Sequence, residues 1–270
     1  MSIRFVAVAA LLLSSAASGA ANPPLKPLGK WVVGSDPTCI IQRDFGLAEK
    51  PVRFELRTIP TLDAVTLSVT DDGRVDGDEF VPATVSFGAT QPPIQRPMEI
   101  YQIKGSKSRF GWLSLDKQQL REALQTGLIM LKSNGMNVSL AVPDLSDGIE
   151  ALDACEASEL ESWGMSREKQ RAIASWPDID GPAAKYVSSQ DYPRDALVEM
   201  STGVNSARVK VDDKGIPSDC TLLETSHNDA LDQTLCAIVL RFRFRPATDR
   251  SGRPVASFKA LRFDWRMPSQ

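Results

Sequence analysis

The sequence predicts an α+β protein in which a mainly β first domain with helices is followed by a small α/β domain. Short segments of alternating apolar and polar residues, the pattern of half-buried strands, fill most of residues 29–115. Residues 186–270 instead show the order helix, hairpin, helix, strand. The chain of 270 residues is long enough for both parts, because one domain typically takes about 100–200 residues.

The first residues have the composition of a secretory signal peptide. Arg4 precedes an apolar run over residues 5–13, and small residues follow up to Ala20. We therefore expect cleavage after Ala20, which removes residues 1–20 and leaves the mature protein in the periplasm. The alternative is an uncleaved anchor, because residues 5–21 approach the minimum of about 17 residues for a membrane span. After cleavage we expect no membrane span, since no later segment is as apolar over such a length.

Residues 21–164 are expected to form the mainly β domain, whose role the sequence does not indicate. The expected strands are 38–43, 52–57, 64–69, 80–87, 98–103 and 109–115, with a further pair on either side of Asn134-Gly135. Asp116 is expected to cap a short helix that runs to Leu124. A longer helix over 145–163 has one apolar face, which includes Ile149, Leu152, Cys155 and Leu160.

Four cysteines remain in a chain that is expected to enter the oxidising periplasm, which favours disulfides. Four cysteines permit three pairings, and spacing alone does not choose among them. If each domain folds as a unit, the pairs are Cys39–Cys155 in the first domain and Cys220–Cys236 in the second. Buried free thiols are the alternative. A metal site is disfavoured, because the chain has no Cys-x-x-Cys and only one histidine, His227.

A polar stretch over residues 165–185, with Pro177 and Gly181-Pro182, is expected to connect the domains and to include a short helix over 166–174. In the second domain Pro193 suits the first turn of a helix, since its missing N–H costs nothing there. The remaining elements are a strand over 206–212, a tight turn at Gly215, a returning strand over 219–225, a helix over 229–242 and a final strand over about 255–265.

The C-terminal part resembles the C-terminal domain of TonB, the energy transducer of Gram-negative bacteria. The resemblance covers about residues 186–268 and depends on the order and spacing of several pieces. These are Tyr192-Pro193 with Ala196, Val209-x-Val-Asp-Asp-Lys-Gly-Ile-Pro-Ser218, Leu231-Asp232, Phe242-Arg-Phe-Arg-Pro-Ala247 and Gly252-Arg-Pro-Val255.

The resemblance implies a non-catalytic module that binds a protein partner. In that family the domain binds the TonB box, a short peptide of an outer-membrane receptor, alongside its last strand. An exposed sheet edge offers unpaired N–H and C=O groups that an incoming strand satisfies. The corresponding edge here is Ala256, Ser257, Phe258, Lys259, Ala260, Leu261, Arg262 and Phe263. Basic residues at this edge, Lys259, Arg262 and Arg266, favour an acidic peptide or, alternatively, keep the edge soluble.

The sequence departs from an energy transducer in two respects. A transducer needs a long proline-rich spacer, and none follows residue 21; the anchor helix of the family also carries a histidine, which residues 5–21 lack. A periplasmic binding protein is therefore the leading prediction, and a membrane-anchored transducer for receptor-mediated transport is the alternative. Pairing of the same edge between two copies is a further alternative, and the oligomeric state stays open.

The rest of the sequence gives little support for nucleic-acid binding, metal binding or catalysis. The net charge of −3 argues against nucleic-acid binding. The acidic cluster Asp76, Asp78 and Glu79 lacks the calcium-loop pattern. An uncharacterised periplasmic enzyme stays an alternative, but His227 is the only imidazole and adjacent Ser226 does not make it a catalytic pair. We therefore expect no catalytic residues, no metal and no cofactor.

Overall fold

The computed structural model describes residues 23–35, 38–75, 79–88, 92–124, 126–133 and 135–267. The expected signal peptide lies outside these ranges, as do Asp76 and Asp78 of the acidic cluster. Within the described ranges, no helix combines the length and the apolar composition that a membrane crossing requires.

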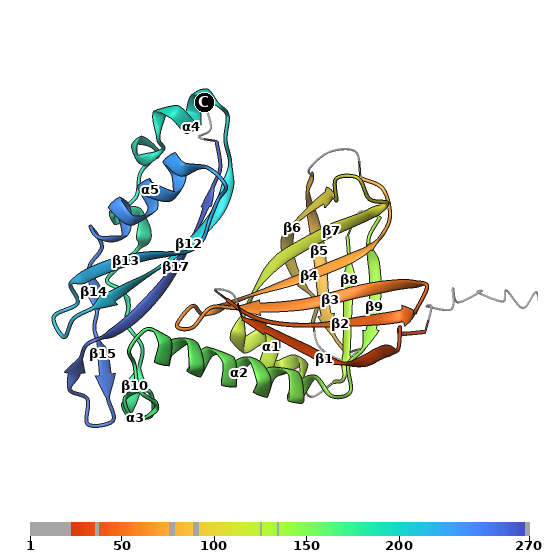
Figure 1. The fold of residues 1–270 in the computed structure, drawn as a ribbon, viewed down its shortest axis with the longest axis horizontal. Coiled ribbons are helices and arrows are strands. Elements are labelled where there is room, and N and C mark those ends of the chain that lie inside the picture. Colours follow the sequence, from red (N-terminus) through yellow and green to blue (C-terminus); the bar gives the residue numbers. More distant parts are fainter. Residues whose placement is uncertain are drawn as a thin grey trace, which may run out of the picture.

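The first domain is built on one antiparallel sheet of nine strands, in the order β1-β2-β3-β4-β7-β6-β5-β8-β9 (Figure 1). The strands are β1 (Pro27–Ser35), β2 (Cys39–Leu47), β3 (Lys50–Thr58), β4 (Ala64–Asp72), β5 (Glu79–Phe87), β6 (Ile94–Gln102), β7 (Ser108–Asp116), β8 (Leu128–Lys132) and β9 (Asn137–Ala141). The sheet curls until its edges nearly meet. Leu25 bridges Leu140 of β9, and its N–H donates to the carbonyl of Ser139 over 2.7 Å.

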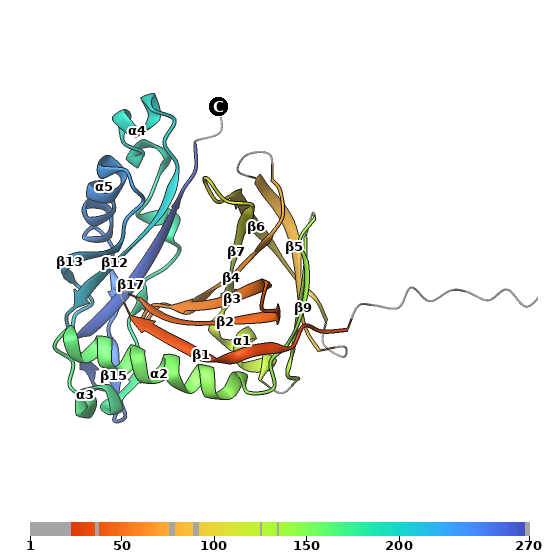
Figure 2. The same cartoon turned by 45° about the vertical axis from the view of Figure 1, so that its right-hand side comes forward.

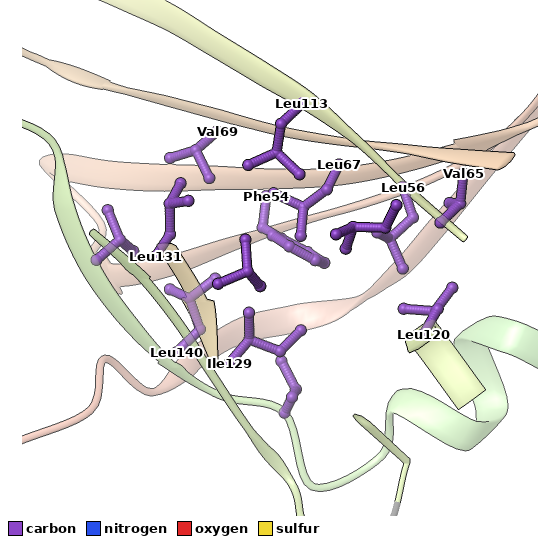
Figure 3. Packing of buried hydrophobic residues seen from close by; sticks show 14 of the residues in the cluster. Phe54, Leu56, Val65, Leu67, Val69, Leu113, Leu120, Ile129, Leu131 and Leu140 are labelled. Atoms are coloured by element: carbon purple, nitrogen blue, oxygen red, sulfur yellow. The ribbon is translucent and has the colours of Figure 1, made fainter. Parts of the chain in front are cut away.

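Buried side chains at alternate positions of the strands fill the space inside the curled sheet. In β2, every second residue from Cys39 to Phe45 is buried. Side chains from β3, β4, β7, β8 and β9 point toward one another in this core, and Leu120 of α1 (Lys117–Ala123) closes one end (Figure 3). The large apolar area that is removed from water here is the main source of stability for this domain.

Helix α2 (Leu145–Ser162) covers the core beside β1 and β2 (Figure 1). It approaches closely at Gly148, where a Cβ atom would lie 2.7 Å from the Ile41 side chain and 3.3 Å from the Trp31 ring. Asp144 at its start forms an ion pair with Arg43 over 2.6 Å. The Cys39–Cys155 disulfide joins the helix to β2, as the sequence predicted.

The C-terminal domain has a three-stranded antiparallel sheet in the order β13-β12-β17, with α5 packed on one face. Its elements are α4 (Arg194–Val198), β12 (Gly203–Val211), β13 (Pro217–Glu224), α5 (Asp229–Val239) and β17 (Ser257–Trp265). The predicted order helix, hairpin, helix, strand is confirmed. The second predicted disulfide, Cys220–Cys236, is also present and joins β13 to α5.

The segment that was expected to connect the domains contains regular structure. Helix α3 (Arg167–Ala172) follows α2, and two 3-10 turns, η1 (Ala183–Lys185) and η2 (Ser189–Asp191), precede α4. Two short strands between them pair with the C-terminal domain. These pairs are β10 (Ile173–Ser175) with β15 (Ala247–Asp249), which also pairs β16 (Pro254–Val255), and β11 (Asp178–Ile179) with β14 (Phe244–Arg245). Helix α3 lies within the short helix expected over 166–174, whereas strands of two or three residues are too short for an alternating pattern to predict them.

Candidate partner-binding edge

Strand β17 is an edge strand of the C-terminal sheet. It pairs with β12 without interruption from Gly203↔Trp265 to Val211↔Ser257, and within the described residues no strand pairs with its other side. Of the predicted edge residues, Ser257 to Phe263 lie in β17, and exposed Ala256 lies between β16 and β17.

The backbone groups on the free side of β17 can be assigned from one hydrogen bond. The N–H of Ala260 donates to the hydroxyl oxygen of Thr61 over 2.8 Å, so it points away from β12. Because outward and inward groups alternate along an antiparallel strand, the N–H and C=O groups of Phe258, Arg262 and Asp264 point the same way. We call the backbone groups of these four residues the outer rim of β17.

The side chains of β17 divide between two faces. Leu261, Phe263 and Trp265 pack into the core beneath α5. Phe258 and Ala260 lie on the opposite face, which contacts the first domain: Ala260 packs with Ile59, and the Phe258 ring lies 5.8 Å from the Trp163 ring at the end of α2. Figures 1 and 2 show β17 on the side of its sheet that is nearer to the first domain.

A buried polar network holds the carboxyl end of β17 in place. The indole N–H of Trp265 donates to the side-chain oxygen of Asn205 over 2.8 Å, and the Asn205 amide donates to Asp232 over 2.9 Å. Burial alone would raise the pKa of Asp232. Hydrogen bonds from Thr225, Ser226 and Asn205 outweigh burial and hold the pKa below its ordinary value. The network positions the strand, and its polar side chains find their hydrogen-bond partners within the domain.

The three basic residues at the predicted edge all contact other parts of the protein. The Lys259 ammonium lies 3.4 Å from Asp63, which is 93% exposed. The Arg262 guanidinium donates to the Thr66 hydroxyl over 2.6 Å and lies 5.0 Å from the Trp112 ring centroid. Burial is the largest influence on Arg262 and lowers its pKa.

Farther along the strand, Arg266 pairs with Asp264 over 2.6 Å and lies 4.1 Å from the Phe80 ring centroid. Asp264 is exposed. A cavity of about 250 Å³ lies beside these two residues, where β17 faces the first domain. It is lined by Phe80, Arg96, Pro97, Glu99, Trp112, Ser114, Leu115, Asp116, Asp264 and Arg266. Of the four residues of the outer rim, Asp264 is therefore the exposed one.

Residues 188–267 match the family model of the Gram-negative bacterial TonB protein C-terminal. This part of the chain is a TonB C-terminal domain. The predicted resemblance of this part of the chain is confirmed. The two disulfides in the chain fit an oxidising compartment. No curated protein and no solved structure matches the chain.

Sequence reasoning did not find the residues of the first domain that contact the TonB C-terminal domain. Thr61, Thr66, Trp112 and Trp163 all do so, and none belongs to a motif that marks an interface. Thr61 has one unusual property, a φ of 64°, which is rare for a β-branched residue. The neighbouring Pro60 marks a turn in the sequence but does not reveal what the turn contacts.

His227 and the adjacent Ser226 lie in the loop between β13 and α5. His227 is exposed, and the adjacent Ser226 hydroxyl donates to Asp232 over 2.7 Å and not to the imidazole. Among the residues that the structure describes, no three His, Cys, Asp or Glu side chains are grouped to hold a metal ion.

Proposed function

We propose that the protein is a periplasmic binding protein whose TonB C-terminal domain takes up a strand of a protein partner at the outer rim of β17. The observation that carries the proposal is the position of β17 at the edge of its sheet, with outward backbone groups at Arg262 and Asp264 that no strand of the described residues satisfies. An incoming extended peptide would gain main-chain hydrogen bonds there. An outer-membrane receptor with a TonB box is the partner class that the family match supports.

The proposed role is non-catalytic, and export is part of it. Both disulfides support folding in the periplasm. A membrane-anchored energy transducer is the second candidate. The apolar run of residues 5–21 favours it if that run is not cleaved.

The test removes one outward N–H from the rim. Asp264→Pro deletes the donor without removing a hydrogen bond to β12, because the N–H of Asp264 points outward; edge strands tolerate proline in this orientation. Asp264→Ala is the matched control, since it removes the same carboxylate and keeps the N–H. A partner carbonyl left without its donor costs about 1–3 kcal/mol.

The assay is photo-crosslinking in cells, with a photoreactive residue in place of exposed Met267. We expect a covalent adduct with one envelope protein, retained in Asp264→Ala and reduced about fivefold or more in Asp264→Pro, as a loss of about 1 kcal/mol or more implies. Mass spectrometry should locate the adduct in an extended segment of the partner. An adduct of equal yield in both variants would show that the rim amide takes no part in binding.

A further inference from the structure

We propose that the turn between β3 and β4 of the first domain is an intramolecular competitor for the outer rim of β17. In this arrangement a partner strand can pair with the whole rim only after the turn has left it. The proposal rests on the proposed function of the same rim. It assigns to the first domain a role in regulating when the TonB C-terminal domain binds.

Thr61 of this turn already occupies one donor of the outer rim. Its hydroxyl accepts the N–H of Ala260 over 2.8 Å, and both residues are buried. A strand that paired along β17 would place its own carbonyl group at that N–H, since each outward residue of an antiparallel edge exchanges hydrogen bonds with the incoming strand. One donor of the rim is thus already used, and the atoms around Thr61 fill the space that the strand needs.

The conformation of the turn supports a specific role for the Thr61 hydroxyl. The Leu62 N–H donates to the Ile59 carbonyl over 3.2 Å, with Pro60 and Thr61 between them, and Thr61 has a φ of 64°. Pro at the second position and a positive φ at the third fit a type II turn, which favours Gly or Asn at the third position. A threonine here is strained. Such strain tends to persist where a side chain has a function. In this turn the hydroxyl of Thr61 accepts the hydrogen bond from the Ala260 N–H.

Apolar contacts on either side hold the turn against the sheet. Ile59, Leu223 and Ala260 form one buried cluster, and Leu62 and Trp163 pack against it. The cluster is small compared with the cores of the two domains. Domain contacts of this size are expected to open more readily than the domains unfold.

Charged contacts extend the interface on both sides of the cluster. Arg208 lies over the rings of Trp163 and Phe258 at 5.2 and 5.4 Å. Arg57 lies 3.7 Å from Glu224 of β13. These contacts involve polar groups that water can solvate when the domains part. Their loss therefore costs less than exposure of a purely apolar interface of equal size would.

The outer rim is blocked at one position and exposed at another. Around Ala260 the turn blocks it, whereas at Asp264 it is accessible from solvent. A partner strand can make first contact at the accessible end. Extending the pairing toward Ala260 then requires displacement of Thr61, so part of the binding free energy is spent on opening the domains.

The experiment compares two substitutions at one position in the full mature chain. Thr61→Val keeps the shape and the strained φ but removes the acceptor, whereas Thr61→Ser keeps the hydroxyl. The probe is a fluorescent synthetic peptide that spans the TonB box of an outer-membrane receptor, and its affinity is measured by fluorescence anisotropy. We expect Thr61→Val to bind about tenfold tighter than the parent chain, equal to about 1.4 kcal/mol, and Thr61→Ser to bind like the parent.

Hydrogen exchange at the Ala260 amide provides the second measurement and should be faster in Thr61→Val only. Equal affinity of Thr61→Val and the parent chain, with binding that is lost in Asp264→Pro, would overturn the competition and leave the proposed function intact. Absence of binding in the parent and in every variant would overturn both. Faster exchange together with tighter binding supports the proposal.

Discussion

Arg262 offers a direct measure of how strongly the two domains are held together. In Arg262→Met the chain loses a 2.6 Å hydrogen bond to the Thr66 hydroxyl and the contact of the guanidinium with the Trp112 ring at 5.0 Å. A hydrogen bond that involves a charged group contributes about 1.5–3 kcal/mol, and a partly desolvated cation–π contact up to about 2 kcal/mol.

The cost of burying the guanidinium opposes these gains. Burial is the largest influence on Arg262 and lowers its pKa, which means that the charged form loses hydration in the folded protein. The gross gain from the two contacts is about 1.5–5 kcal/mol. Because removing an ion from water costs up to several kcal/mol, we expect the intact side chain to give a net stabilisation of only about 1–2 kcal/mol. Arg262→Met should therefore be destabilised by this smaller amount.

A double-mutant cycle with Trp112→Leu isolates the contact between the two side chains. Urea unfolding of the four proteins gives the free energies, and we expect a coupling energy of about 1 kcal/mol. The exposed Arg250, changed to Met, is the control and should shift stability by less than about 0.5 kcal/mol. A coupling energy near zero would refute the reasoning, because Arg262 would then contribute nothing through Trp112.

Three further predictions concern other parts of the chain. Replacing both Cys220 and Cys236 by Ser opens a loop of 16 residues and should lower the free energy of unfolding by about 3 kcal/mol, measured in thermal melts without reductant so that Cys39–Cys155 stays intact; an unchanged melting temperature would contradict it. Mass spectrometry of the mature protein should find Ala21 at the amino terminus, and an intact terminus in the membrane fraction would favour the anchored transducer. The lowered pKa of Asp232 predicts that its contribution to stability is present above its ordinary value of 3.8 and is lost as pH falls through the lower folded value. Asp232→Asn should accordingly be less stable than the parent at pH 7, with a gap that closes in acid, and a gap that is independent of pH would count against this.

Local structure was predictable where one pattern persisted over a full element. Helix α2 was expected over 145–163 and spans Leu145–Ser162, because its apolar residues recur at helical spacing. Both disulfides followed from the assumption that each domain folds as a unit, and the TonB C-terminal domain followed from the order of several short pieces. All of these depend on residues within one domain.

Contacts between the domains were not predictable, since no periodic pattern connects residues so far apart. Thr61 and Ala260 are separated by 199 positions, and Thr66 and Arg262 by 196. The resemblance to the TonB C-terminal domain implied a binding edge at the last strand, and β17 lies at the edge of its sheet. The sequence did not show that a turn of the first domain lies against the middle of that edge. That information lies in how two folded surfaces fit, which depends on both folds together.

A single proline explains why the first domain is open where the end of β17 approaches it. Strands β6 and β7 pair from Gln102↔Arg109 only as far as Glu99↔Trp112, although both strands continue. The hydrogen bond from the Ile103 N–H to the Ser108 carbonyl fixes the alternation, so the next bonded pair would be Pro97 with Ser114.

Pro97 has no N–H to give to the Ser114 carbonyl, and the ladder ends there. The two strands separate beyond this point, and residues of their unpaired ends line one side of the cavity beside Asp264 and Arg266. A partner strand bound at the accessible end of the rim would therefore lie against the first domain as well as against β17. Selectivity for the partner would then depend on both domains, which a TonB C-terminal domain alone would not provide.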